Sequence, residues 1–321
     1  SGTELQDNSL NSNTGTINGA IWTAGSTAST ANFTAATDDV GTVTGALTSG
    51  NTTDDTELVL SGTNESGSSV KVYNGSDEFG TATVDGTSWS YSATVVDGTT
   101  YQFNVKETDL AGNTSNATSN FAVTGDTTPP TVSSVAITSA TGIQNNLLNA
   151  GDNVSVTVTF SENSPVTGTP QLTLAVGNDN RTADYTSSGS GATTKVFKYT
   201  IQAGDNDTNG ISIRANALTL NNGTIRDLAE NNAILTHSAV DNNSSYKVDT
   251  TPPRVDNFTL SDTALKAGDN ATVTLVFSEA VASFSSAADI TADNGTLAAM
   301  SSADNITWTG TFTPTANTED A

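Results

Sequence analysis

Apolar and polar residues alternate with a period of two along most of the chain, and helical periodicity is nearly absent. The clearest stretches are 101–105, 154–160 and 273–277, where only Val276 breaks the alternation. Clusters of Gly, Asn, Asp and Ser separate such stretches at short intervals, as turns do. The pattern predicts an all-β protein of many short antiparallel strands packed as sandwiches, with at most one helical turn, near 287–290.

An internal repeat divides the chain. The sequence Asp-Thr-Thr-Pro-Pro begins at Asp126 and again at Asp249. After each copy come Ala-Gly-Asp-Asn and then a predicted strand that ends in Phe-Ser-Glu, at Glu162 and Glu279. Paired prolines lack N–H donors and favour extended backbone, so each pair makes a short, stiff connector between domains. A weaker repeat places Asp-Leu-Ala-x-Asn before each connector.

These boundaries predict tandem sandwich domains arranged end to end. We expect an N-terminal segment that is either the end of a preceding domain or a pair of added strands, then a first sandwich, a larger second sandwich and a third, possibly truncated one. The predicted ranges are 1–36, 37–126, 127–249 and 250–321.

Charge narrows the possible partners. The 321 residues include 34 Asp or Glu and 10 Lys or Arg, a formal net charge of −24. Such a chain repels nucleic acids and anionic membranes, so we expect neither nucleic-acid binding nor membrane insertion. There are no cysteines, which excludes disulfides and thiolate metal sites. Carboxylates attract hard cations, and calcium is the first candidate; the alternative is that the charge only keeps the protein soluble.

Calcium takes six to eight oxygen ligands, which a domain junction can supply from a turn, the linker and a loop of the next domain. We therefore predict that Asp109 and Asp126 with Glu162 form one set, and Asp227 and Asp249 with Glu279 another. Asp38, Asp39 and Asp55, beside Asp54, form an acidic cluster at the start of the first full domain. The alternative is that these residues only complete turns, as Asp often does; we favour turns for the Ala-Gly-Asp-Asn copies.

Catalysis has little support in the sequence. The one histidine, His237, lies in a polar stretch and is expected at the surface. Trp22, Trp89 and Trp308 are spread one to a segment, as core or rim residues, and do not form a sugar-binding platform. We predict that the chain is not an enzyme, with a polysaccharide-active enzyme as a minor alternative.

Four motifs carry a family likeness: Thr-Asp-Asp-Val-Gly at 37–41, Asp-Leu-Ala-Gly-Asn at 109–113, Tyr-Lys-Val-Asp-Thr-Thr-Pro-Pro at 246–253 and Phe-Ser-Glu-Ala-Val at 277–281. In order and spacing they resemble the bacterial immunoglobulin-like (Ig-like) repeat domains of large biofilm-associated and RTX-type surface adhesins. The resemblance implies an extracellular extender on the bacterial surface, which projects an adhesive module and contacts neighbouring domains. The alternative is a module of the same adhesin that binds a sugar or peptide, best placed in the larger domain, 127–249.

Overall fold

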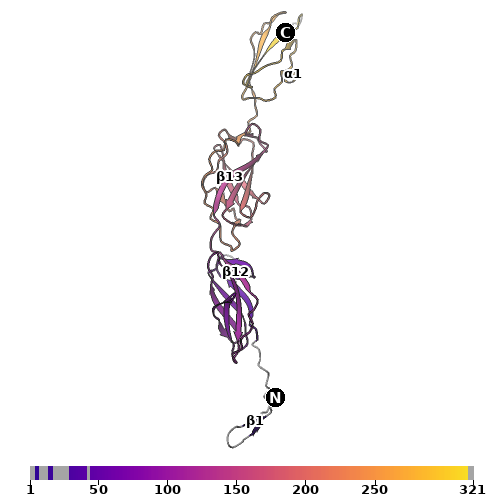
Figure 1. Cartoon of the computed structure of the whole chain (residues 1–321). Helices are drawn as coiled ribbons and strands as arrows, with labels where there is room; N and C mark the ends of the chain where they lie inside the picture. The colour runs from indigo at the N-terminus through magenta and orange to yellow at the C-terminus, as the bar shows by residue number, and fades with distance from the viewer. Residues whose placement is uncertain (1–3, 7–13, 17–28, 42–43, 317–321) are drawn as a thin grey trace.

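The computed structural model describes residues 4–6, 14–16, 29–41 and 44–316. Three strand-rich domains follow one another end to end, and the described chain forms an elongated rod (Figure 1). One short helix, α1 (Ser286–Asp289), is the only helix in the described part of the chain. The predicted all-β architecture of tandem sandwiches is confirmed, as is the single helical turn.

Domain 1 is a sandwich of two five-stranded sheets, with strand orders β4-β3-β6-β10-β9 and β5-β12-β11-β7-β8. Trp89 and Phe103 are the largest side chains buried between them. The strands are β3 (Asn32–Asp38), β4 (Gly45–Ala46), β5 (Asn51–Thr53), β6 (Glu57–Thr63), β7 (Ser69–Asn74), β8 (Asp77–Thr81), β9 (Thr83–Asp85), β10 (Ser88–Thr94), β11 (Thr100–Thr108) and β12 (Phe121–Gly125).

Domain 1 begins earlier in the chain than the predicted boundary at residue 37. Strand β3 crosses that boundary and pairs with β6. Phe33 packs edge-on against Trp89 and stacks on Phe121, so it belongs to the core of domain 1. Within the predicted N-terminal segment, β1 (Glu4–Gln6) and β2 (Thr14–Thr16) form an antiparallel pair; Trp22 lies outside the described residues.

Domain 2 has a larger core, in which nineteen buried apolar residues form one cluster. A six-stranded sheet of order β13-β15-β19-β18-β17-β21 packs with the smaller sheets β14-β23-β20 and β16-β22. The strands are β13 (Val132–Thr141), β14 (Leu147–Leu148), β15 (Asn153–Phe160), β16 (Val166–Thr167), β17 (Gln171–Val176), β18 (Asp179–Thr186), β19 (Thr194–Thr200), β20 (Asn206–Asp207), β21 (Leu218–Thr219), β22 (Thr224–Ile225) and β23 (Lys247–Asp249).

Strand β15 shows how the sequence pattern sets the sheet. Its even-numbered residues, from Val154 to Phe160, are buried and the residues between them are half-buried, because successive side chains in a strand point to opposite faces. The turn before β15 contains the Ala-Gly-Asp-Asn sequence, in which the Asp152 carboxylate accepts the N–H of Asn149 at 2.8 Å. Asp269 accepts the N–H of Lys266 in the same way in the second copy. Both contacts agree with the turn interpretation.

Domain 3 has a single four-stranded sheet among its described residues, of order β24-β25-β27-β26. Its buried core cluster holds three described residues, Val273, Leu275 and Met300, compared with nineteen in domain 2. The elements are β24 (Val255–Leu260), β25 (Ala271–Phe277), α1, β26 (Gly295–Leu297) and β27 (Thr307–Pro314).

Candidate metal centre at the first domain junction

Three carboxylates meet where domain 1 joins domain 2. Asp126 follows β12 in the linker, Glu162 follows β15, and Asp227 follows β22. One carboxylate oxygen from each lies within 4.8 Å of the others, and this is the only such acidic group found in the described part of the chain. Asp227 is buried, and the other two are half-buried. Two separate loops of domain 2 and the linker therefore converge on one point.

Local hydrogen bonds hold Asp227 in place. Its Oδ1 accepts the N–H groups of Ala229 at 2.8 Å and Asn231 at 2.9 Å, and its Oδ2 accepts the Asn231 amide at 2.8 Å. The same amide also donates to the backbone carbonyl of Asp126 at 2.8 Å. The Asp-Leu-Ala-Glu-Asn turn thus fixes its own carboxylate and ties the linker to domain 2.

Domain 1 contributes further acidic residues on the other side of the linker. The Asp126 N–H donates to the Thr53 carbonyl at 2.8 Å, which places the linker beside Asp54 and Asp55. The Thr53 hydroxyl donates to Asp38 at 2.6 Å. The predicted acidic cluster of Asp38, Asp39 and Asp55 begins at the first strand of domain 1 in sequence and lies, in space, at the end of the domain that faces the junction. The exposed Asp39 is joined to the cluster by its N–H, 3.2 Å from Asp55 Oδ2.

The carboxylates at this junction repel one another. Burial raises the pKa of Glu162, and the charges of Asp126 and Asp227 raise it further. Burial also raises the pKa of Asp126, with a contribution from Asp227. Among the described residues, no Lys or Arg forms an ion pair with these carboxylates. Arg226 is directed instead to Glu230, at 3.3 Å.

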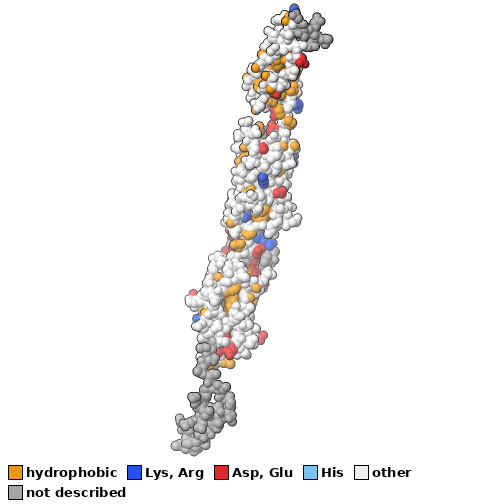
Figure 2. All heavy atoms as spheres, turned by 90° about the vertical axis from the view of Figure 1, so that its right-hand side faces the viewer, with side chains coloured by type: hydrophobic (Ala, Val, Ile, Leu, Met, Phe, Trp, Pro, Cys, Tyr) orange, Lys and Arg blue, Asp and Glu red, His pale blue; other side chains and the backbone are white. Residues whose placement is uncertain are grey.

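Asp54 is the domain 1 residue most affected by this repulsion. Burial raises its pKa, and Asp38 in its own domain and Asp227 in domain 2 add to the shift. Its Oδ1 is buried and has no hydrogen-bond partner. A buried carboxylate oxygen without a donor is costly, and a cation would remove that cost. Figure 2 shows acidic side chains (red) where domain 1 meets domain 2, with basic ones (blue) beside them.

Asp97 of domain 1 also lies at this junction, although it belongs to none of the sequence motifs. It accepts the Thr127 N–H at 2.7 Å and the Thr128 hydroxyl at 2.9 Å. These hydrogen bonds lower the pKa of Asp97, so it stays ionised and holds the linker against domain 1.

The second junction has a smaller set of carboxylates. Burial raises the pKa of Glu279, and the neighbouring charge of Asp249 adds to it. Both residues line a cavity of about 490 Å³ together with Asp152 and the two linker prolines. The Thr250 hydroxyl accepts the Gly204 N–H at 2.9 Å and donates to the Asp205 carbonyl at 2.9 Å. Neutral hydrogen bonds therefore secure this linker to domain 2.

The predicted pairing of Asp109 with Asp126 is wrong. Strand β11 runs antiparallel to β12, with Thr100 opposite Thr124, so Asp109 is at the far end of domain 1 from Asp126. At about 3.3 Å per residue the separation is roughly 30 Å. Asp109 instead closes its own turn by accepting the N–H groups of Ala111 and Asn113.

The pairing of Asp227 with Asp249 is wrong for the same reason. Asp249 ends β23 at the C-terminal end of domain 2, while Asp227 lies beside Asp126 at the N-terminal end. At the first junction, the Asp-Leu-Ala-x-Asn turn that lies beside the linker therefore belongs to the domain after the linker and not to the domain before it. The structure does bring Glu162 to Asp126 and Glu279 to Asp249, as the repeat predicts.

The described hydrogen bonds of the His237 ring are to backbone atoms. Its Nε2 accepts the Ala217 N–H at 2.9 Å, and its Nδ1 lies 2.8 Å from the Ser238 carbonyl. These contacts position a loop of domain 2 beside β13.

The fold and the comparisons together define the class of protein. A model of the bacterial Ig-like domain matches residues 27–127, and a second model of that description matches residues 249–321. The two matches span more than half of the chain, and it belongs to the bacterial Ig-like domain family. Such domains are typically non-catalytic modules of extracellular or cell-surface proteins. Within the described residues, no helix has the length and apolar character needed to cross a membrane.

Solved structures with a related chain path include fibronectin(III)-like modules of CbhA from Clostridium thermocellum, at 13% identity over 63% of this chain and 90% of that one, with a TM-score of 0.27. A marsupial T cell receptor has 10% identity over 84% and 91% of the two chains, with a TM-score of 0.32. The Bacteroides ovatus protein SGBP-B, solved with a mixed-linkage heptasaccharide, has 14% identity and a TM-score of 0.22. The match covers 92% of this chain and 63% of that protein. Curated proteins gave no match.

Proposed function

We propose that the chain is a calcium-stiffened spacer of a bacterial cell-surface adhesin, which holds an adhesive module away from the cell. The observation that carries the proposal is the convergence of Asp126, Glu162 and Asp227 at the first junction. One carboxylate oxygen from each of the three lies within 4.8 Å of the others, close enough for a single cation to contact all three.

The donor set also suits calcium by its chemistry. Every candidate ligand is an oxygen atom, as hard cations require; on the domain 1 side Asp54, whose pKa the charge of Asp227 raises, has a buried Oδ1 without a hydrogen-bond partner. When bound, the ion would neutralise the mutual repulsion of these carboxylates. Because Asp227 belongs to domain 2 and Asp54 to domain 1, a shared ion would resist bending between the two domains. At the second junction, Asp249 and Glu279 offer a smaller site.

Stiffness is a useful property in a spacer. The three domains already lie in a line, with short linkers that contain paired prolines (Figure 1). Removing flexibility at the linker keeps the ends of such a rod apart. Ion binding to the aligned, folded state alone also stabilises that state, by roughly 2.7 kcal/mol at a hundredfold excess over the dissociation constant.

Small-angle scattering and thermal melting, each in calcium, magnesium or chelator, test this function. We expect calcium to narrow the distribution of end-to-end distances and to raise the melting temperature of domains 1 and 2. Magnesium should do less, because it prefers a strict octahedral shell and retains its waters. The double variant Asp126→Asn with Glu162→Gln is the control and should keep only the smaller response of the second junction. Identical scattering and melting profiles in calcium and in chelator would refute the proposal.

The adhesin context has its own test. A spacer domain should have no ligand of its own, so arrays of immobilised glycans and peptides should give no signal with the full chain. Saturable binding of one glycan or peptide would replace the spacer with the alternative, a ligand-binding module.

A further inference from the structure

One lysine of domain 2 is buried without an anionic partner. Lys195 is 3% exposed and lies on the core face of β19, on the same side as Phe197 and Tyr199. It forms no ion pair with any described residue. Lysine is almost never this buried unless it is paired, and burial lowers the pKa of Lys195 because the charged form loses water. The contacts of the ammonium show what it holds in place.

The ammonium begins a hydrogen-bond path to the candidate metal centre. Lys195 Nζ donates to the Gly191 carbonyl at 2.7 Å and to the Ala192 carbonyl at 2.8 Å, in the turn between β18 and β19. The Ala192 carbonyl also accepts the N–H of Ser164, at 3.0 Å. Ser164 is buried, and its hydroxyl donates to the Glu162 carbonyl at 2.9 Å. The path therefore ends on the backbone of a candidate calcium ligand.

The loop between β15 and β16, residues 161–165, also contacts the other two parts of the metal centre. Its first residue donates its N–H to the Thr131 carbonyl at 2.8 Å, next to the linker prolines. The carbonyl of its last residue accepts the Arg226 N–H at 3.2 Å, immediately before Asp227. The position of this loop therefore sets where Glu162 lies relative to the linker and to the Asp227 turn.

The two neighbouring domains have tryptophan at the position of Lys195. Strand β27 pairs with β25 as β19 pairs with β15, and Trp308 lies opposite Leu275 as Lys195 lies opposite Val158. In domain 1 the position belongs to Trp89, which is likewise the second residue of its strand. The fold thus accepts a large neutral side chain at this position, and packing alone does not require a lysine in domain 2.

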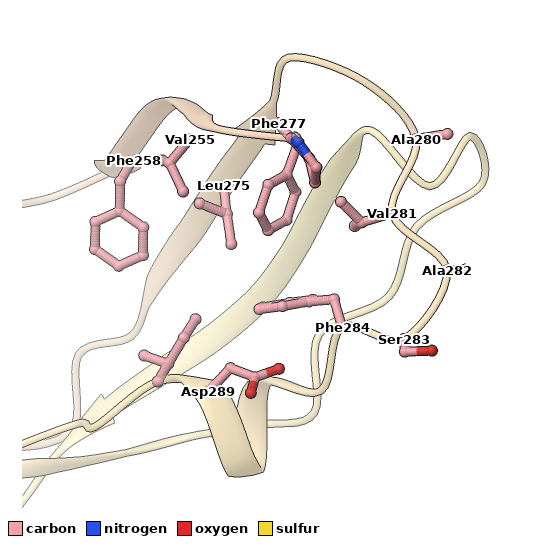
Figure 3. Close-up of a pocket in the computed structure, with 12 residues that line it drawn as sticks. Val255, Phe258, Leu275, Phe277, Ala280, Val281, Ala282, Ser283, Phe284 and Asp289 are labelled. Carbon is pink, nitrogen blue, oxygen red and sulfur yellow. The ribbon is translucent and has the colours of Figure 1, made fainter. Parts of the chain in front are cut away.

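Domain 3 repeats the path with an indole in place of the ammonium. The Trp308 N–H donates to the Asn305 carbonyl at 3.2 Å, and the same carbonyl accepts the Val281 N–H at 2.9 Å. Val281 comes two residues after Glu279, in the loop that Figure 3 shows beside Phe277. In both domains, a side-chain N–H at this strand position therefore holds the loop that carries the junction glutamate.

We propose that Lys195 is a positioning residue of the candidate metal centre, which holds the 161–165 loop, and with it Glu162, through the turn between β18 and β19. The inference rests on the proposed function, because the centre binds calcium only under that proposal. A charge-assisted hydrogen bond is roughly twice as strong as a neutral one, so the ammonium holds the turn more firmly than an indole does. Without it, calcium binding would have to order the loop as well, which lowers the affinity.

Lys195→Met in the full chain tests this role, because methionine is of similar length and has no donor. In chelator, amide hydrogen exchange at Ser164 should become faster, since its acceptor carbonyl is no longer fixed. Calcium affinity at the first junction, measured by isothermal titration calorimetry, should fall by about tenfold, as it does for groups that orient metal ligands. The melting temperature in chelator should stay equal or rise, because an uncharged side chain is easier to bury than an unpaired ammonium.

Ser164→Ala interrupts the same path one step further on. It should lower calcium affinity as Lys195→Met does, and the double variant should bind no more weakly than the weaker single variant, because residues that act through one path are not additive. Lys198→Met is the matched control: it removes the same charge from the exposed face of β19 and should change neither exchange nor affinity.

Unchanged calcium affinity in Lys195→Met would overturn the proposal, and a lower melting temperature with intact affinity would assign the lysine to the fold alone. Losses that add in the double variant would show that Lys195 and Ser164 act separately, which also contradicts it. Failure of the proposed function has a different signature: the wild type would bind no calcium, while exchange at Ser164 would still respond to Lys195→Met.

Discussion

The two domain junctions arise from the same repeated linker sequence but hold their linkers by different means. At the first, Asp126 lies close to Glu162, Asp227 and the acidic residues at the end of domain 1. Among the described residues, no Lys or Arg forms an ion pair with Asp126, Glu162 or Asp227. At the second, Thr250 and Thr251 hydrogen-bond to domain 2, and Asp249 faces Glu279. The two linkers therefore share a sequence, while the loops around each one decide how many carboxylates without an ion-pair partner gather at the junction.

Behind the second linker is a buried ion pair that contributes to its rigidity. The Asp205 carboxylate accepts the Tyr199 hydroxyl, the Gln202 N–H and the Arg181 guanidinium. Burial opposes ionisation, but these hydrogen bonds lower the pKa of Asp205 below its ordinary value. The backbone carbonyl of the same residue accepts the Thr250 hydroxyl. This junction thus carries its own positive charge.

The largest effect is expected from Asp205→Asn. It should lower the free energy of unfolding of domain 2 by about 2–3 kcal/mol, because an amide cannot satisfy all three donors and leaves a guanidinium without its buried partner. Arg181 keeps Asp179 at 3.0 Å, which limits the loss. Urea unfolding measures the change, and the loss should be equal in calcium and in chelator. Asp184→Asn, at an exposed site of the same domain, is the matched control. A loss confined to calcium-containing buffer would remove the distinction between the junctions.

Asp227→Asn should have the next largest effect, on the first junction. We expect calcium affinity there to fall by about tenfold to a hundredfold, equivalent to roughly 1.4–2.7 kcal/mol, because a buried carboxylate is replaced by a neutral amide. Isothermal titration calorimetry measures it. Asp249→Asn should leave the tighter calcium-binding event unchanged. If Asp249→Asn weakens that event as much as Asp227→Asn does, the stronger site is at the second junction and our comparison is reversed.

Removal of one linker hydroxyl should have a smaller effect. Thr250→Val loses the contacts to Gly204 and Asp205 and should cost about 1 kcal/mol in thermal unfolding of domain 2. Thr127→Val, at the equivalent position of the first linker, is the comparison, since it keeps the backbone N–H contact to Asp97 and loses only the smallest of the hydrogen-bond contributions to that carboxylate. Equal losses in both variants would contradict a specific role for the Thr250 hydroxyl.

Acidification should affect the first junction more than the second, and in opposite directions with and without calcium. In chelator, the raised pKa values of Asp126 and Glu162 mean that the folded protein takes up protons at a higher pH than the unfolded chain. The free energy of unfolding should therefore rise as pH falls from neutral toward the ordinary values of 3.8 for Asp and 4.5 for Glu. In calcium, the same protons compete with the ion, and affinity should decrease over that window.

The pH effect is measured as the difference in melting temperature between the wild type and Glu162→Gln. The subtraction removes the contributions of Asp97 and Asp109 to the pH dependence of stability. Their lowered pKa values act in the opposite direction. Glu279→Gln should give a smaller difference, because Asp249 is the one described charge that acts on it. A wild type that loses stability on acidification in chelator more than Glu162→Gln does would contradict this account.

Much of the fold was predictable from sequence. Alternation identified strands such as β15 and β25, because a period of two puts one set of side chains on the core face. The repeat correctly related Glu162 to Asp126 and Glu279 to Asp249, since each Glu follows the strand that lies beside its own linker. Asp54 was noticed only as part of an acidic run, and Asp97 carried no signal, because its role depends on a hydrogen bond to Thr127.

By itself, the sequence determined the strands, the repeated linkers, the excess of carboxylates and the carboxylate pairs nearest each linker. The tertiary structure alone decided which turn meets which linker. Asp109 is close to Asp126 in sequence but at the opposite end of domain 1, while Asp227 is distant in sequence and adjacent in space. The physical reason is that antiparallel strands reverse direction at every turn, so that the position of a loop depends on how many strands precede it. The candidate metal centre is a product of that topology.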